Sequence, residues 1–475
     1  MADPDGSTPA TPHRPDQRPH RPTAVDLGQA GVPDAPPSEI ELSTEPAGAD
    51  GAAAATGESE AAGSRLAKLG LIAALVSRVF GRLVGIILVI FLAREASDET
   101  VAVYGYLLGT ATLVLVLTDL GVAAIAGREV AAGRLPAGGA LRSALPLQAF
   151  SVAAAALATV LLTVFFGPKG VPVSALLLTV AFVVVSGFNG LWAELLRATG
   201  RVMLEGALQM GGAVALVIGG LIVVYSGGSA TALMVVVFAK ELVVLVICIV
   251  LLPPRDEPSL AWKSLLGQSI WVAVAGTAMV VLWRQGTIVA GTGSTAVLAA
   301  YVVASRYLDA GVTVAHTVGF GLVPGMSALS NDPAALRRAA IRYLKLGTIA
   351  GLAVAVIGFV GAPWLVEVPF GARWEGAIPA VRYLAISALP ILLSFVLWPV
   401  LLAQHRVKLL AGAGIAAVLV GLPTGLVLFK LWHDPAAPVV GTGVGAVVLL
   451  AVLLWGVKDL LRGNDTRQLS RQRPE

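Results

Sequence analysis

Long apolar runs, separated by short charged or Pro/Gly-containing breaks, dominate the chain from about Leu66 onward. A helix needs about 20 apolar residues to cross the hydrocarbon core of a bilayer. Twelve runs meet this requirement, at approximately 68–93, 102–126, 144–166, 172–193, 206–226, 229–252, 265–290, 296–322, 340–362, 377–402, 407–430 and 438–458. The pattern predicts an all-α polytopic membrane protein with about twelve transmembrane helices.

Composition agrees with this fold class and narrows the chemistry. The 475 residues are 56% hydrophobic and only 13% charged, and the mean hydropathy is +0.83, well outside the range of soluble domains. The single cysteine, Cys248, lies inside an apolar run and is expected to pack there. Because there is no Cys/His cluster, Walker A sequence or other catalytic motif, we expect no metal, no cofactor and no enzymatic activity.

The first 64 residues differ from the rest of the chain. They hold 11 of the 29 acidic residues but only three arginines, and they are rich in Pro, Ala, Gly, Ser and Thr. Such a segment cannot bury enough apolar surface to fold, so residues 1–64 are predicted to be a disordered acidic cytoplasmic tail. No apolar segment precedes Leu66, and the first helix is expected to serve as an uncleaved signal anchor. Residues 463–475 are predicted to be a basic cytoplasmic tail.

The basic residues between the spans predict the topology. With both termini on the cytoplasmic side, thirteen lysines and arginines fall in the inner loops. The outer loops carry only four, namely Arg94, Lys169, Arg373 and Lys430. This positive-inside asymmetry predicts a multi-pass protein of the inner (plasma) membrane with cytoplasmic N- and C-termini.

The chain also repeats itself at long range. The end of span four reads LWAELLRATGRVML (191–204), and the end of span ten reads LWPVLLAQHRVKLL (397–410). The two share Leu-Trp, Leu-Leu and Arg-Val with a one-residue slip. Six spans followed by six in the same orientation imply a parallel repeat, with an N-lobe at 65–255 and a C-lobe at 256–462. Transporters built this way place substrate between the halves.

Several charges lie within the predicted spans. Arg78 and Arg82 are four residues apart near the middle of the first span, so they share one helix face and must face protein or a wet cavity. Others are Asp119, Lys240, Glu241, Arg284, Arg306 and Asp309. Among these eight residues, five positive charges against three negative ones favour an anionic ligand. The alternative is that each arginine is neutralised by a neighbouring helix, for example by Asp119.

The first half resembles a known family in three stretches: SRVFGRLVGIILVIFLAREASDETVAVYGY, DLGVAAIAGREVA and LLRATGR. These are similar to the polysaccharide-transporter branch of the multidrug/oligosaccharidyl-lipid/polysaccharide (MOP) exporter superfamily, which includes Wzx-like lipid-linked oligosaccharide flippases. The resemblance implies a MATE-like V of two six-helix bundles around a central cavity, and a polyprenyl-diphosphate-linked glycan as cargo. Two features depart from the family: Trp283-Arg284-Gln285 replaces an acidic residue common in span seven, and the acidic tail is additional.

The resemblance gives the charged residues expected roles. Because a guanidinium engages phosphate oxygens through two parallel hydrogen bonds, Arg78, Arg82, Arg284 and Arg306 are the candidate substrate-binding residues. The spacing of Arg306 and Asp309 also suits a structural ion pair on one helix face. Asp119, Glu241 and Asp309 are the candidate sites for a coupling proton or sodium ion. Lys240 and Glu241, about 100° apart on a helix, are expected to face different partners.

The sequence thus predicts a transporter that flips a polyprenyl-diphosphate-linked oligosaccharide, a polysaccharide or cell-wall precursor, by alternating access. Its expected partners are the lipid-linked glycan, membrane lipids, and a polysaccharide polymerase or glycosyltransferases, with no nucleic acid. Two alternatives stay open: a cation-coupled multidrug or small-molecule exporter of the same fold, and a non-transporting scaffold in a cell-envelope assembly complex.

Overall fold

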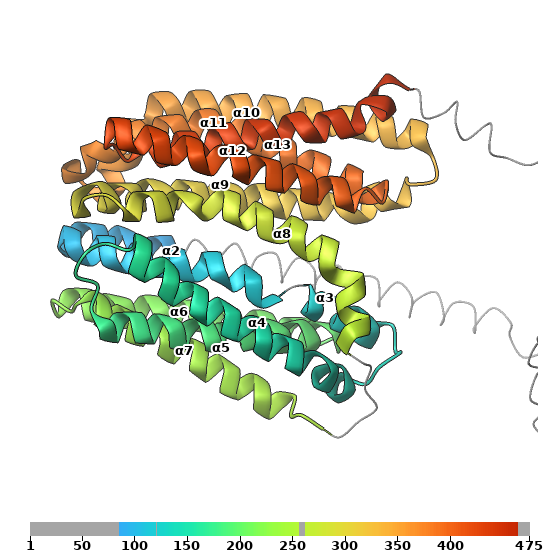
Figure 1. The fold of residues 1–475 in the computed structure, drawn as a ribbon, viewed down its shortest axis with the longest axis horizontal. Helices are drawn as coiled ribbons and strands as arrows, with labels where there is room; N and C mark the ends of the chain where they lie inside the picture. The colour runs from blue at the N-terminus through green and yellow to red at the C-terminus, as the bar shows by residue number, and fades with distance from the viewer. Residues whose placement is uncertain (1–84, 120, 256–261, 464–475) are drawn as a thin grey trace, which may run out of the picture. The chain divides into compact units, whose positions relative to one another are not determined.

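The protein is helical throughout the part of the chain that the computed structural model describes, residues 85–119, 121–255 and 262–463 (Figure 1). Eleven helical segments there are long and apolar enough to cross a membrane. They correspond one to one with predicted spans two to twelve. The predicted first span is helical over 85–95, where its description begins. The expectations for residues 1–64 and 464–475 lie outside the described residues.

The helices follow one another with short connections. Their bounds are α2 Asp98–Asp119, α3 Val122–Ala131, α4 Ala137–Phe166, α5 Val173–Ala198, α6 Val202–Tyr225, α7 Ala230–Leu251, α8 Trp262–Gly291, α9 Thr295–Ala328, α10 Pro333–Phe370, the short 3-10 helix η1 Ala372–Ala377, α11 Ile378–Ala403, α12 Val407–Trp432 and α13 Ala436–Arg462.

Capping residues explain where several helices begin. The Ser229 side chain accepts a hydrogen bond from the Ala232 N–H at the start of α7, and Ser294 does the same for the Val297 N–H of α9. At α10 the Asp332 carboxylate accepts from the Ala335 N–H at 2.9 Å, and a proline follows in the first helical position. These side chains satisfy N–H groups that have no partner inside the helix.

Two boundaries differ from the sequence prediction. The predicted span 102–126 is broken, because Gly121 adopts a left-handed conformation (φ 72°) between α2 and α3. This φ suits glycine and is costly for other residues. The outer loop expected at about 363–376 is mostly helix instead, since α10 runs through Pro363 and ends at Phe370. A proline interrupts few hydrogen bonds in a membrane helix whose neighbours satisfy the freed groups.

The helices pack in two sets. Helices α4 to α7 contact one another, and so do α10 to α13, as the two layers of Figure 1 show. Helix α2 contacts both α8 and α9. The contact with α9 is close: a Cβ on Gly105 would lie 2.3 Å from Val302, and the neighbouring Tyr104 and Tyr301 are each 2% exposed. The division into lobes at residues 255 and 256 stays a prediction.

The two sequence echoes form the same turn. After α5, Thr199, Gly200 and Arg201 donate backbone hydrogen bonds to the carbonyls of Leu195, Arg197 and Leu196. After α11, the residues 205 positions later make the same three bonds. The side chains match too, since Arg201 donates to the Leu251 carbonyl and Arg406 to the Gly456 carbonyl. One structural motif is therefore used twice. The turn residues are 205 positions apart, whereas the shared Leu-Trp pairs are 206 positions apart.

Candidate functional site

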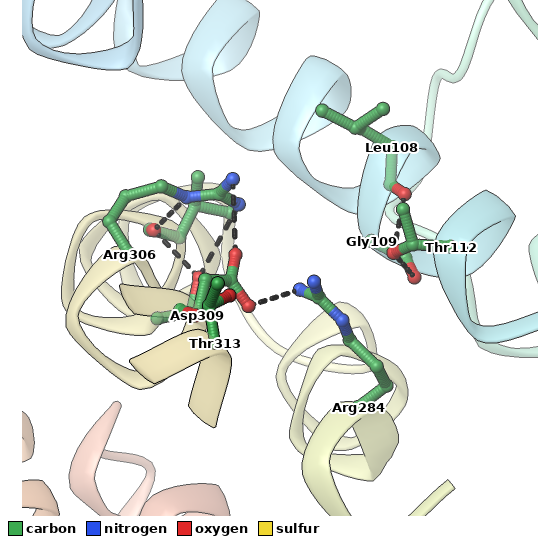
Figure 2. Close-up of polar contacts among 9 residues, drawn as sticks. Leu108, Gly109, Thr112, Arg284, Arg306, Asp309 and Thr313 are labelled. Atoms are coloured by element: carbon green, nitrogen blue, oxygen red, sulfur yellow. Dashed lines mark hydrogen bonds and ion pairs between the residues drawn. The ribbon is translucent and has the colours of Figure 1, made fainter. Parts of the chain in front are cut away.

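Three charged side chains meet between α8 and α9 (Figure 2). Arg284 of α8 contacts one oxygen of Asp309 (Nη1 to Oδ1, 2.7 Å), and Arg306 contacts the other (Nη1 to Oδ2, 3.4 Å). The expected pairing of Arg306 with Asp309 is thus present, but Asp309 also binds Arg284 from the neighbouring helix. We call these residues the Arg284–Asp309–Arg306 triad.

The triad is mostly buried and carries a net positive charge. The exposed fractions of the three side chains are 14%, 15% and 12%. One carboxylate against two guanidinium groups leaves a charge of +1, and a charge in a low-dielectric wall attracts counter-ions strongly. Each arginine has five N–H donors, and the contact with Asp309 uses one donor of Arg284. The net charge and the donor-rich guanidinium groups are the chemistry that suits an oxyanion.

The local contacts hold the triad in place. Arg306 also donates from Nε to the Val302 carbonyl at 3.3 Å, and Thr313 donates to the backbone carbonyl of Asp309 at 2.6 Å. Across from Arg284 lies α2, where Thr112 donates to the carbonyls of Leu108 and Gly109 (Figure 2). The triad thus faces α2, which also packs against α4 and α5.

Arg284 stands near the outer end of the predicted span 265–290, where a long side chain can reach towards water. The ion pair with Asp309 holds it inside the protein instead. The next residue, Gln285, is 2% exposed, and both its amide atoms have no hydrogen-bond partner among the described residues. A buried amide without hydrogen-bond partners lowers the stability of the fold, so packing alone does not explain a glutamine at this position of α8.

The other predicted residues do not join this triad. Arg78 and Arg82 lie outside the described residues. Asp119 is the last residue of α2, and its side chain also lies outside the described part. Glu241 lies on α7, which packs against α5 and α6.

The prediction that Lys240 and Glu241 face different partners is wrong, because the Lys240 ammonium forms an ion pair with the Glu241 carboxylate. Both side chains are flexible enough to bend towards each other from adjacent positions. The other carboxylate oxygen accepts a hydrogen bond from Asn189 Nδ2 at 2.6 Å. Sequence reasoning missed Asn189, although an amide within an apolar span was the available signal. This closed set of contacts favours a structural role for Glu241 over an ion-coupling one.

A second charged cluster lies near the turn after α5. Arg197 contacts both Glu194 and Glu205, the latter at 2.8 Å. On the loop side, Arg134 donates two hydrogen bonds to Glu129, at 2.6 and 2.8 Å. The hydrogen bond from Arg134 lowers the pKa of Glu129 below its ordinary value. The Arg197–Glu205 pair joins α5 to α6, and the Arg134–Glu129 pair joins α3 to the loop that follows it.

A groove with a volume of about 500 Å³ lies away from the triad. It is lined by Ile341, Leu344, Lys345, Thr348, Ile349 and Leu461. The lining is almost wholly apolar and includes none of the predicted substrate-binding residues. His316 lies edge-on to Phe395, with ring centres 5.9 Å apart, and is itself exposed.

Comparison with known proteins decides the family. Residues 143–379 match the family described as polysaccharide biosynthesis protein. The chain belongs to this family. No curated protein matches the chain.

Solved structures of MOP-superfamily proteins share the fold of this chain. The lipid II flippase MurJ in an inward closed conformation has 12% identity and a TM-score of 0.65, covering 82% of this chain and 87% of its own. An inward-facing multidrug resistance MATE transporter has 15% identity and a TM-score of 0.63, covering 83% and 99%. A Pyrococcus furiosus MOP transporter, described as having a binding pocket of reverse polarity, has 16% identity and a TM-score of 0.56, covering 82% and 96%.

Proposed function

We propose that this MOP transporter moves a polyprenyl-diphosphate-linked oligosaccharide across the plasma membrane by alternating access. The observation that carries the proposal is the net positive Arg284–Asp309–Arg306 triad, mostly buried between α8 and α9 and facing α2. Its guanidinium N–H donors suit the oxygens of a diphosphate. The family match to polysaccharide biosynthesis proteins supports a glycan as the rest of the cargo.

Arg78 and Arg82 extend this proposal to the first span. Both are placed near mid-membrane by the sequence, and both need an anionic partner or a wet cavity there. We assign them to the diphosphate together with Arg284 and Arg306. The N- and C-termini are placed in the cytoplasm, as the distribution of loop cations predicts.

Asp309 also supports a role in energy coupling. Protonation or cation binding at its carboxylate would weaken its hold on both arginines and change the charge that the headgroup meets. Asp119 stays a second coupling candidate, whereas the satisfied carboxylate of Glu241 makes it the weakest of the three.

The same geometry argues against the main alternative. A cavity that exports cationic drugs should be acidic, because a second positive charge is repelled. The triad has the opposite sign. Within this fold, a carrier of anionic lipids is therefore favoured over an exporter of cations.

The proposal is tested by binding a short-chain polyprenyl diphosphate to the purified protein, measured by native mass spectrometry. Arg284→Ala and Arg306→Ala should each weaken binding about tenfold or more, because a hydrogen bond to a charged group contributes roughly 1.5–3 kcal/mol. Arg→Lys variants should bind with intermediate affinity, since lysine keeps the charge but loses the paired donors.

Lys430→Ala, which removes a cation from the end of α12, serves as the matched control and should bind normally. The neutral polyprenol of the same length should bind all variants alike. If both arginine variants keep wild-type affinity for the diphosphate, the triad does not hold the headgroup.

A further inference from the structure

Two segments that lie about 280 positions apart in the sequence exchange hydrogen bonds at the ends of their helices. Arg94, in the last turn of the helix at 85–95, donates from Nε to the Pro369 carbonyl at 2.7 Å and from Nη2 to the Val368 carbonyl. In return, Arg373 of η1 donates to the carbonyls of Ala93 and Ala96, the latter at 2.8 Å.

Each arginine therefore caps the other segment's helix. The last carbonyls of a helix have no partner within it and carry the negative end of the helix dipole, so a guanidinium is a favourable cap. Arg94 caps the end of α10, and Arg373, which follows α10, caps the helix at 85–95. We call this reciprocal pair, together with Trp374, the arginine latch.

Trp374 forms the buried part of the latch. It is 3% exposed, and its indole Nε1 donates to the Ala93 carbonyl at 2.9 Å. Ala93 itself is fully buried. The Arg373 guanidinium lies over the Trp374 ring, 4.9 Å from the ring centre, which orients both donors towards the same carbonyl.

The latch explains an oddity of the charge distribution. Only four cations fall in the outer loops of the predicted topology, and Arg94 and Arg373 are two of them. These two arginines depart from the positive-inside pattern, and their role as helix caps gives a reason for their presence on the outer side. Neither Lys169 nor Lys430, the other two, takes part in the latch.

Burial along the neighbouring helices indicates which side the latch closes. Residues 298–305 of α9, near the latch end of the molecule, are buried, whereas Val314 and Val318 further along the helix are 55% and 50% exposed. On α8, Thr287 is 4% exposed and faces Gly109 of α2, while Trp271 near the other end is 47% exposed. The helices are therefore packed most closely at the latch end.

We propose that the arginine latch is the outer gate of the transporter, which holds the extracytoplasmic side closed until cargo is released there. This proposal rests on the alternating-access function and the topology given above. Its structural part is that loss of the latch bonds shifts the protein towards an outward-open state.

The test uses a single reporter cysteine in the full-length protein. Cys248→Ala removes the native thiol, and Thr287→Cys places a near-isosteric thiol beneath the closed end. Reconstituted right-side-out, the protein is treated with a membrane-impermeant maleimide from the outside. Labelling of a buried thiol proceeds at a rate set by the population of the open state.

The double variant Arg94→Ala/Arg373→Ala should be labelled at least about tenfold faster, because each lost charge-assisted bond shifts a two-state equilibrium by about that factor. Trp374→Phe, which keeps the ring but loses the donor, should give a smaller rise. Lys169→Ala/Lys430→Ala removes the same number of outer cations and should leave the rate unchanged.

A double arginine variant labelled at the wild-type rate would overturn the proposal. An equal rise in the Lys169→Ala/Lys430→Ala control would overturn it too, since charge loss alone would then be the cause. The labelling needs no substrate, so its result is independent of whether the protein carries a lipid-linked glycan.

Discussion

Asp309 sets the charge balance at the centre of the proposed site. It is one carboxylate shared by two arginines, at 2.7 and 3.4 Å, so neither guanidinium is fully neutralised. The sequence spacing predicted the contact with Arg306, because residues three apart share a helix face. The spacing gave no sign of Arg284, since that contact joins two helices whose packing the sequence does not encode locally.

Glu129 offers a residue-scale test through pH. Because Arg134 lowers the pKa of Glu129 in the folded protein, their ion pair stabilises the fold above the ordinary glutamate pKa of about 4.3. The stabilisation is lost as the pH falls through the lowered pKa. Glu129→Gln should therefore lower the Tm at pH 7, and the difference from wild type should shrink in acid.

The measurement is thermal unfolding in detergent, followed by tryptophan fluorescence. It covers roughly pH 3.5 to 7.5, a range that includes the ordinary glutamate pKa of about 4.3. Glu95→Gln, which removes an exposed carboxylate, is the control and should leave the Tm unchanged. A Glu129→Gln deficit that is the same at every pH would contradict an electrostatic origin.

At the scale of elements, glycines decide how α12 and α13 pack. Gly421 and Gly425 of α12 meet Gly441 and Gly445 of α13, with a Cβ on Gly441 lying 2.5 Å from the Gly425 Cα. These are small-xxx-small pairs on both helices, which let two backbones approach closely. The sequence contains 53 glycines. Pairs of glycines four positions apart are common in such a sequence, so this spacing alone could not single out these four residues.

Gly441→Ala should therefore destabilise the protein by roughly 1–3 kcal/mol, since the methyl group meets backbone atoms that cannot move aside. Gly412→Ala, on α12, adds its methyl group to open space and should be neutral or slightly stabilising, because alanine favours helix. Denaturant or thermal unfolding of the two variants gives the comparison. Equal stabilities would contradict the close packing of α12 on α13.

The turns after α5 and α11 have the same backbone structure but different side-chain contacts around it. The turns after α5 and α11 have the same backbone hydrogen bonds and the same arginine cap. In the first half, Arg197 and Glu205 add an ion pair at 2.8 Å. The positions 205 residues later are Leu402 and Leu410, so the second half packs by apolar contact instead. The arginine at the turn, Arg201 or Arg406, is the same in both halves and was visible in the sequence repeat. Its acceptor is a backbone carbonyl, so the contact does not depend on the neighbouring side chains.

At the scale of the whole molecule, the long apolar runs alone predicted the eleven membrane-length helical segments among the described residues, since bilayer thickness fixes the length of each span. Helix ends were harder to predict. Pro363 suggested a loop but lies within α10, and Gly121 breaks an apolar run that showed no change in hydropathy. Contacts across 280 residues, such as Arg373 with the Ala93 carbonyl, have no local signal in the sequence.

The central claim is that this transporter recognises the diphosphate of its lipid-linked cargo. The most direct measurement compares transport of one glycan on two carriers, a polyprenyl diphosphate and a neutral polyprenyl ether, in proteoliposomes with a lectin that reports the outer leaflet. The account predicts that the diphosphate-linked glycan appears outside and that Arg78→Ala, Arg82→Ala and Arg284→Ala each abolish this, while the neutral lipid is not moved. Equal transport of the two lipids, or full transport by the arginine variants, would contradict it.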